Sequence, residues 1–366
     1  MKLFKKLFSK EEEKPINSYQ DFWEWFLVNE KKFFETVRKG RSGNIAKKFF
    51  DVISPKLNEL KEDIWYLTGM LDDNTVELIL TSDGNIKLFY LIEELVEAAP
   101  NLKGWKFSAL KPEHNIENVG IEMDNYSFSN ENIFFYSNES DNYPDEIDIT
   151  VVHLEYNEKN KEEIINGCYL FIDNYLGELN SSHLIDNIEF TNSKSAEKKL
   201  IPIEKLKSFI IWREKEFLEK YEGIRRNTEN DTYSSLEARL KNGNKLIAVV
   251  NSDLMYWDAK GSHPWLLRFE IKYDGKENNG FPNEETYQFL NTIEENISSY
   301  LKDFDGYLNI GRETADNLRE IHFACKDFRK PSKVADKILS KYSKEIDIDY
   351  VIYKDKYWRS FERFQT

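Results

Sequence analysis

Residues 265–273 alternate between two kinds of side chain. One set of positions is apolar or aromatic and the other is mostly charged: Trp265, Leu267, Phe269, Ile271 and Tyr273 against Leu266, Arg268, Glu270 and Lys272. Because successive side chains of a strand point to opposite faces, this alternation predicts a strand with one buried face and one wet face. A chain that contains such a strand must also supply a layer that covers the buried face.

The segments around this strand predict a complete α+β module. The expected elements are a strand at 245–251, the strand at 265–273, a helix capped by Asn283, a hairpin of strands at 307–314 and 318–325, a helix opened by Pro331, and a strand at 347–353. From residue 265 onwards the order is β-α-β-β-α-β. That order predicts a ferredoxin-like arrangement, with helices over one face of a sheet.

A second series of segments has a similar order. The expected elements are strands at 76–80, 105–110, 133–136, 147–154 and 184–190, with helices at 85–99 and 162–179. We therefore predict an α+β protein with two ferredoxin-like modules. The predicted domains are an N-terminal helical segment (1–75), an acidic α+β module (76–198), a connecting helix and linker (199–240) and a C-terminal α+β module (241–366).

The acidic charge of the chain is concentrated in one segment. The 366 residues have a formal net charge of −15, and residues 113–198 account for all of it with 19 acidic and 4 basic side chains. Such a charge disfavours general nucleic-acid binding, which needs clustered cations. It fits either a solvated acidic surface or a docking face for a basic protein. The candidate docking residues are Asp141, Asp145, Glu146, Asp148 and Glu155.

The compartment follows from weaker signals. Only two cysteines are present, Cys168 and Cys325, and both lie in apolar stretches typical of buried thiols. Residues 1–10, MKLFKKLFSK, would be amphipathic as a helix and could then touch an anionic membrane surface, but we expect a frayed, solvated terminus. Lysines interrupt the apolar residues, so the segment does not resemble a signal peptide. We expect a cytoplasmic protein without membrane contact, and the oligomeric state stays open.

The sequence contains no motif for a cofactor, a metal ion or catalysis. Its glycines are too scattered for a phosphate-binding loop, and its five histidines are well separated. His322 and Cys325 are three residues apart in an expected strand, so they would point to opposite faces and could not bind one ion together. We therefore predict no cofactor, no metal and no catalytic residue.

One group of residues could still form a site. If Leu308 and Ile310 point into the core, alternation places Arg312 there too, and the same argument applies to Arg319. Two buried arginines need carboxylate partners. Glu313 and Glu320 should alternate outward, so we expect the partners to be Asp355 or Asp349.

This arginine group has two interpretations. It is either a structural ion-pair cluster or an anion-binding pocket, in which arginines would contact carboxylate or phosphate in bidentate fashion. The full candidate set is Arg312, Arg319, His263 with its neighbour Ser262, Trp265 and Trp358.

Several short stretches of the C-terminal part resemble a known family. They are Pro264-Trp265, Gly280-Phe281-Pro282 followed by Glu284-Glu285, Gly311-Arg312-Glu313-Thr314 continuing through Arg319-Glu320 to Phe323, and Asp355-Lys356-Tyr357-Trp358. Together they resemble the bacterial domain-of-unknown-function 695 family over residues 240–364, with Asn317 where that family usually has a turn glycine. The resemblance implies no catalytic residues. At the level of fold, the module is also similar to the ribonuclease E inhibitor family, which is a small acidic α+β module.

These observations lead to two functional hypotheses. The first is a non-enzymatic binding or regulatory protein, of the immunity or inhibitor type, that docks a basic protein through its acidic module. The alternative is a small-anion-binding protein or enzyme with its site near Arg312 and Arg319.

Overall fold

The computed structural model describes residues 14–365, and it divides into two units. The first unit contains the residues up to 83 together with 91–111, and the second contains 84–90 and 112–366. Both helices and strands build each unit, so the protein is α+β, as predicted. The predicted amphipathic segment 1–10 lies outside the described residues.

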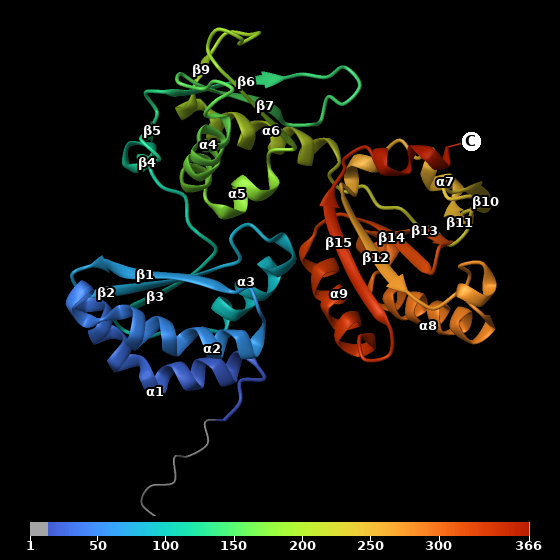
Figure 1. The fold of residues 1–366 in the computed structure, drawn as a ribbon, viewed down its shortest axis with the longest axis horizontal. Helices are drawn as coiled ribbons and strands as arrows, with labels where there is room; N and C mark the ends of the chain where they lie inside the picture. The colour runs from blue at the N-terminus through green and yellow to red at the C-terminus, as the bar shows by residue number, and fades with distance from the viewer. Residues whose placement is uncertain (1–13, 366) are drawn as a thin grey trace, which may run out of the picture. The chain divides into compact units, whose positions relative to one another are not determined.

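The first unit packs helices on a three-stranded sheet (Figure 1). Its elements are α1 (Tyr19–Arg38), α2 (Asp51–Leu60), β1 (Trp65–Asp72), β2 (Thr75–Thr81), α3 (Phe89–Glu97) and β3 (Trp105–Ala109). Ser18 caps α1 by accepting a hydrogen bond from the backbone N–H of Asp21. The aromatic stripe of α1 is buried, and the indole of Trp23 donates to the carbonyl of Leu95.

The sheet of this unit corrects two expectations. β1 is a strand within residues 1–75, where only helices were predicted, and it pairs with β2. In addition, β2 and β3 pair with each other in this sheet, so residues 76–198 do not form a single β-α-β-β-α-β module. Strand β1 could not be recognised from its sequence pattern, because its exposed positions hold apolar residues, among them Trp65, Leu67 and Leu71.

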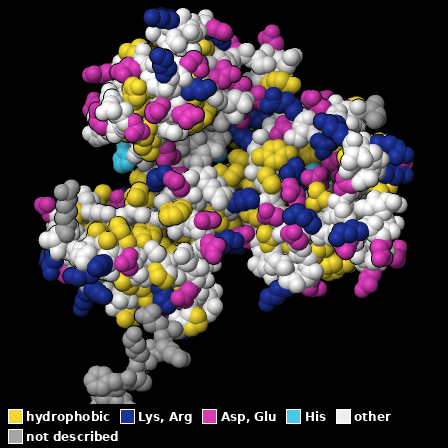
Figure 2. All heavy atoms as spheres, viewed as in Figure 1, with side chains coloured by type: hydrophobic (Ala, Val, Ile, Leu, Met, Phe, Trp, Pro, Cys, Tyr) yellow, Lys and Arg dark blue, Asp and Glu magenta, His cyan; other side chains and the backbone are white. Residues whose placement is uncertain are grey.

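The second unit begins with what we call the middle module, residues 112–220. Its strands are β4 (Ile121–Met123), β5 (Tyr126–Phe128), β6 (Ile133–Asn138), β7 (Asp148–His153), β8 (Asn187–Thr191) and β9 (Ile201–Pro202), and its helices are α4 (Lys161–Leu176), α5 (Glu178–His183) and α6 (Leu206–Lys220). Four strands form a sheet in the order β8-β7-β6-β9, and α4 and α6 contribute side chains to its core. Figure 2 shows acidic side chains gathered over this module.

The C-terminal module follows, with a six-stranded antiparallel sheet. Its elements are β10 (Tyr233–Arg239), β11 (Lys245–Asn251), α7 (Ser252–Met255), β12 (Trp265–Lys272), α8 (Glu284–Tyr300), β13 (Tyr307–Ala315), β14 (Leu318–Cys325), α9 (Arg329–Tyr342), β15 (Asp347–Lys354) and a closing 3₁₀ helix (Arg359–Phe364). The strand order is β10-β11-β13-β14-β12-β15. Asn283 caps α8, as expected, but β10 occupies part of the predicted linker.

The two faces of this sheet have different covers. α8 and α9 lie on one face (Figure 1), while Trp358, Phe361 and Phe364 of the C-terminal segment pack on the other. Strand β12 is buried on both faces along much of its length, because Leu266 packs under this segment and Leu267 lies opposite. The expected wet face of this strand is therefore limited to its charged positions.

A β-bulge at Gly311 controls which side chains of β13 reach which face. The register shifts between Asn309 and Gly311, and Gly311 has φ +141°. An added Cβ there would lie 2.1 Å from the carbonyl oxygen of Val249, so only glycine fits. Before the bulge, Leu308 and Ile310 face the C-terminal segment; after it, Arg312 faces α8.

None of the helices in residues 14–365 is long and apolar enough to cross a membrane.

Candidate functional site

The two arginines of the predicted site lie side by side on the α8 face of the sheet. Arg312 forms an ion pair with Glu294 of α8, with Nη1 2.9 Å from Oε2. Arg319 is only 1% exposed and donates to Asn291 Oδ1 at 2.9 Å and to Thr314 Oγ1 at 3.2 Å. Burial, and then the charge of Arg312, lower the pKa of Arg319. The arginines thus belong to a closed cluster against α8.

The partners expected for these arginines were wrong. Asp355 instead accepts hydrogen bonds from Ser360 and from the backbone of Arg359 in the C-terminal segment. Asp349 accepts from the backbone of Tyr350. Glu294 could not be selected from strand alternation, because it belongs to a helix that packs over the arginines.

Glu313 is also not where alternation placed it. It is buried, and its Oε1 lies 3.2 Å from Nε2 of His322 and also accepts from Arg363. Burial alone would raise the pKa of Glu313, but His322 and Arg363 more than offset this effect and lower it. The bulge explains the error, because it turns Glu313 toward the C-terminal segment.

Glu313, Glu320 and His322 are the residues that could best hold a metal ion within 14–365, since their ligand atoms lie within 4.8 Å of one another. Cross-strand pairing of β13 with β14 brings them together, a pattern that a search along the sequence alone does not detect. However, Arg363 pairs with Glu313, and Arg268 pairs with Glu320. Because cations of the chain already neutralise these carboxylates, the group is an ion network of the protein itself.

His263 lies far from the arginines. It precedes β12, whereas Arg319 pairs with Ile271 near the other end of that strand. Eight residues of extended chain span roughly 25 Å. Trp358 is a core residue whose indole donates to the carbonyl of His263 at 2.9 Å, and Trp265 is buried against Phe328. The structure therefore separates the predicted group: Arg312 and Arg319 lie near one end of β12, and His263 with Trp358 lies at the other.

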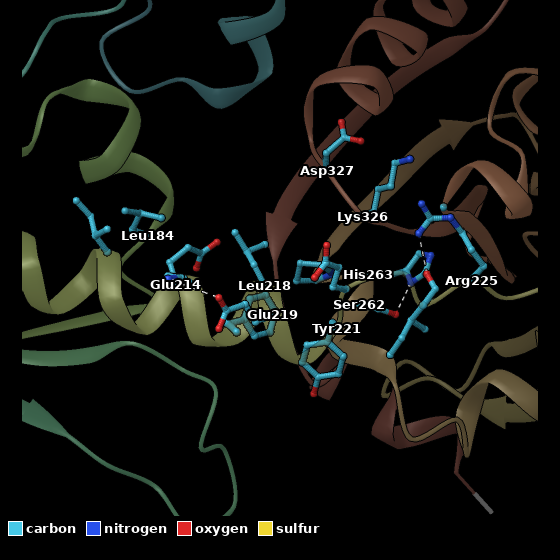
Figure 3. A pocket seen from close by; sticks show the side chains of 18 of the residues that line it. Leu184, Glu214, Leu218, Glu219, Tyr221, Arg225, Ser262, His263, Lys326 and Asp327 are labelled. Atoms are coloured by element: carbon cyan, nitrogen blue, oxygen red, sulfur yellow. Dashed lines mark hydrogen bonds and ion pairs between the residues drawn. The ribbon is translucent and has the colours of Figure 1, made fainter.

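His263 forms part of the wall of a pocket in the second unit, a cavity of about 900 Å³ (Figure 3). The cavity lies between α6 and the loops that precede β12 and follow β14. Burial, and then the charges of Arg225 and Lys326, lower the pKa of His263 to about 4. The imidazole is therefore neutral at pH 7.

The hydrogen bonds of Ser262 assign the tautomer of that imidazole. The Ser262 hydroxyl donates to the carbonyl of Ala259 at 2.6 Å, so its oxygen accepts from Nδ1–H of His263 at 2.8 Å. A base that would activate the serine must accept the serine proton. Here the proton points the other way, so Ser262 and His263 are not a nucleophile–base pair.

The predicted acidic docking residues are only partly available. Asp145 forms an ion pair with Lys220 at 2.8 Å, Glu146 pairs with Arg359 at 2.7 Å, and Asp148 accepts from Asn187 at 2.8 Å. Asp141 and Glu155 are exposed.

Asp145 and Glu146 belong to a contact that joins the middle module to the C-terminal segment. Lys356 is 1% exposed, with Nζ 2.7 Å from Oδ2 of Asp186 and 2.6 Å from the carbonyl of Asp145. The Tyr357 hydroxyl accepts from the backbone of Asp145, and Lys354 pairs with Asp186 at 3.2 Å. We call this set the ionic seam. Part of the predicted docking face therefore docks a basic segment of the same chain.

Beside the seam, carboxylates gather around a smaller cavity of about 330 Å³, which we call the acidic groove. Its acidic lining residues are Glu139, Asp141, Glu146 and Asp148, and its aromatic ones are Phe209 and Trp212 of α6. Trp212 is 53% exposed. Sequence reasoning missed Trp212 and Glu139, although Trp212 lies off the apolar stripe of its helix, which was a detectable signal.

The charges in the groove are incompletely balanced, because four carboxylates line it and Arg213 is the one cation in its lining. Burial raises the pKa of Glu146, and the negative charges of Asp148 and Asp186 raise it further, against the opposing effect of Arg359. Burial also raises the pKa of Asp148, and Asp186 adds to this rise. The groove therefore has an electrostatic preference for an additional positive charge.

Comparison with known proteins identifies one family. Residues 238–365 match the model of the family described as "Family of unknown function (DUF695)", so the resemblance drawn from the sequence is confirmed for the C-terminal part. The match extends from the end of β10 through the closing 3₁₀ helix. No curated protein and no solved structure matches the chain.

Proposed function

We propose that this chain is a non-enzymatic binding protein that docks a basic segment of a partner protein in the acidic groove. The observation behind this proposal is the exposed indole of Trp212 beside four carboxylates, two of which have raised pKa values. A lysine or arginine side chain satisfies both features, because its charge pairs with carboxylates and it also packs on an indole face.

The wider charge of the segment supports the same proposal. The net charge of −15 over residues 113–198 attracts a basic protein over a distance of about one Debye length, which is roughly 8 Å at physiological salt. Such attraction mainly accelerates association, while contacts in the groove determine specificity. A regulatory role of the immunity or inhibitor type fits a partner of this charge.

The alternative site at Arg312 and Arg319 has less support. An anion would have to displace Glu294 from Arg312 and reach a guanidinium that is 1% exposed.

Two further assignments belong to the proposal. We assign a ferredoxin-like arrangement to 265–354, because α8 and α9 connect strands in the spatial order β13-β14-β12-β15. We also assign the protein to the cytoplasm, on two buried free thiols.

Fluorescence anisotropy with a labelled hexa-arginine peptide tests the groove. We expect the peptide to bind the full-length protein at 20 mM salt and to dissociate at 300 mM, since exposed charge interactions are screened. The double variant Glu139→Gln/Asp141→Asn should weaken binding about tenfold, because it removes two charged acceptors.

The matched control is Glu155→Gln/Glu162→Gln, which removes the same charge from exposed positions of the middle module that do not line the groove. Its affinity should stay within about twofold of the parent. If both double variants weaken binding equally, only the net charge matters and the groove is not the site.

A further inference from the structure

The large cavity beside His263 has features that the acidic groove and the family description do not explain. Figure 3 shows Arg225, Lys326, Ser262 and His263 at one end, and Leu184, Glu214 and Glu219 toward the other. The two ends differ in charge, and apolar side chains line the space between them.

The cationic end has spare charge. Among residues 14–365, neither Arg225 nor Lys326 has an ion-pair partner: Arg225 donates to the carbonyl of Ile224, and Lys326 Nζ lies 5.6 Å from the centre of the Tyr307 ring. Both act on the same imidazole, because both lower the pKa of His263. Asp327 also lines the cavity, but it already accepts from the Tyr307 hydroxyl at 2.6 Å and from the backbone of Lys330.

The position of Lys326 depends on the fold. Gly306 has φ +91°, and a Cβ there would lie 2.6 Å from Cδ of Lys326, so the aliphatic part of this side chain packs closely over the glycine. This packing holds the lysine in the lining of the cavity. Glu222 also lines the cavity but is exposed, so water screens its charge.

Between the two charged ends, part of the lining is apolar and unusually open. Leu218 is 59% exposed and Ile211 is also exposed, although both are large apolar residues on α6, while Leu184, Phe217 and Pro264 form buried parts of the same lining. The apolar face of α6 has no cover at these positions within the described chain. Ligand cavities typically combine such a lining with a few convergent charged groups.

We propose that this cavity binds a small organic anion, with a carboxylate or phosphate held by Arg225 and Lys326 and an apolar body lying along Leu218 and Ile211. The charge complementarity and the open apolar wall select this class over a neutral apolar ligand or a simple inorganic anion. The site is independent of the acidic groove, so the failure of either proposal leaves the other intact.

Isothermal titration calorimetry on the full-length chain tests the proposal with three probes. Octanoate has both the charge and the apolar body, octanol lacks the charge, and inorganic phosphate lacks the body. We expect octanoate to bind, and octanol and phosphate to bind at least tenfold more weakly, because each lacks one of the two contacts.

The variant Arg225→Gln/Lys326→Gln should weaken octanoate binding at least tenfold. Both residues are exposed, so this variant is expected to fold, which a thermal melt checks. The matched control is Lys276→Gln/Lys344→Gln, which removes two exposed cations that do not line the cavity. It should bind octanoate like the parent.

Histidine-labelled NMR locates the binding. The imidazole signal of His263, assigned by its loss in His263→Asn, should move on addition of octanoate, while that of exposed His114 should not. The proposal is overturned by any of four results: no binding of octanoate at 10 mM, equal affinity for octanol or phosphate, equal weakening in both double variants, or an unmoved His263 signal.

Discussion

Replacing Gly311 by alanine is the sharpest test of the structure. Its φ of +141° is a conformation that L-residues rarely adopt, which costs about 1–2 kcal/mol. The added Cβ would also lie 2.1 Å from the carbonyl oxygen of Val249 and 2.8 Å from Cα of Val250. Both atoms are backbone, so β11 and β13 would have to separate, and overpacking of this kind costs about 1–3 kcal/mol. We therefore expect Gly311→Ala to lose about 2–5 kcal/mol.

The matched control is Gly243→Ala. Gly243 has φ +89° but nothing within 4 Å of its Cβ position, so this variant carries the conformational cost without the clash. It should lose only about 1–2 kcal/mol. The difference between the two variants isolates the close approach of β11 to β13.

Urea unfolding combined with hydrogen exchange measures both variants. Because the chain has two units, urea unfolding need not be a single global transition. Hydrogen exchange of the backbone amides of β11 and β13 therefore assigns the loss of stability to the C-terminal module. If Gly311→Ala costs no more than Gly243→Ala, the bulge geometry is wrong, and with it the explanation of how Arg312 and Glu313 reach opposite faces.

Two further predictions concern buried charge. Lys356→Ala should lose about 3–5 kcal/mol of stability, because it leaves Asp186 inadequately paired. The double variant Lys356→Met/Asp186→Asn should recover part of this loss. A double-mutant cycle of Lys356→Met and Asp186→Asn in urea measures the coupling, and additive costs would contradict the ionic seam. Acidification should destabilise the second unit, because His263 has a folded pKa of about 4, below its unfolded value of about 6.5. The unfolded chain then binds the proton first, so the contribution of His263 is fully present above about pH 6.5 and declines as the pH falls toward 4, by about 3 kcal/mol. His263→Asn should show a shallower loss between these pH values in urea titrations, and an unchanged slope would show that the imidazole is not buried as described.

Most helices and strands of the C-terminal module could be predicted from local patterns. Asn283 caps one helix and Pro331 marks the start of the other, and apolar and charged residues alternate clearly along 265–273. Strand β1 could not be predicted in this way, because its exposed positions hold Trp65 and Leu67 instead of polar residues. A pattern of burial predicts a strand only where the two faces differ in polarity.

The candidate site was less predictable than the fold. The alternation of faces along β13 is interrupted at the Gly311 bulge, where the register shifts by one residue. Alternation counted from Leu308 and Ile310 therefore placed Arg312 and Glu313 on the wrong faces. The partners of the predicted acidic residues, Lys220 and Arg359, are distant in sequence, and no local pattern indicates such pairs. The localised charge was visible from the sequence, but its division between the ionic seam and the acidic groove required the structure.

The ionic seam also determines how a basic partner must compete. Residues 354–359 act as a ligand that the chain itself tethers beside Asp145, Glu146 and Asp186. A tethered ligand has an effective concentration in the millimolar range, so a free peptide at micromolar concentration does not displace it without much higher affinity. Replacing Lys354, Lys356 and Arg359 by glutamine would remove these partners of Asp186 and Glu146, and so create a second acidic site that the chain's own cations otherwise occupy.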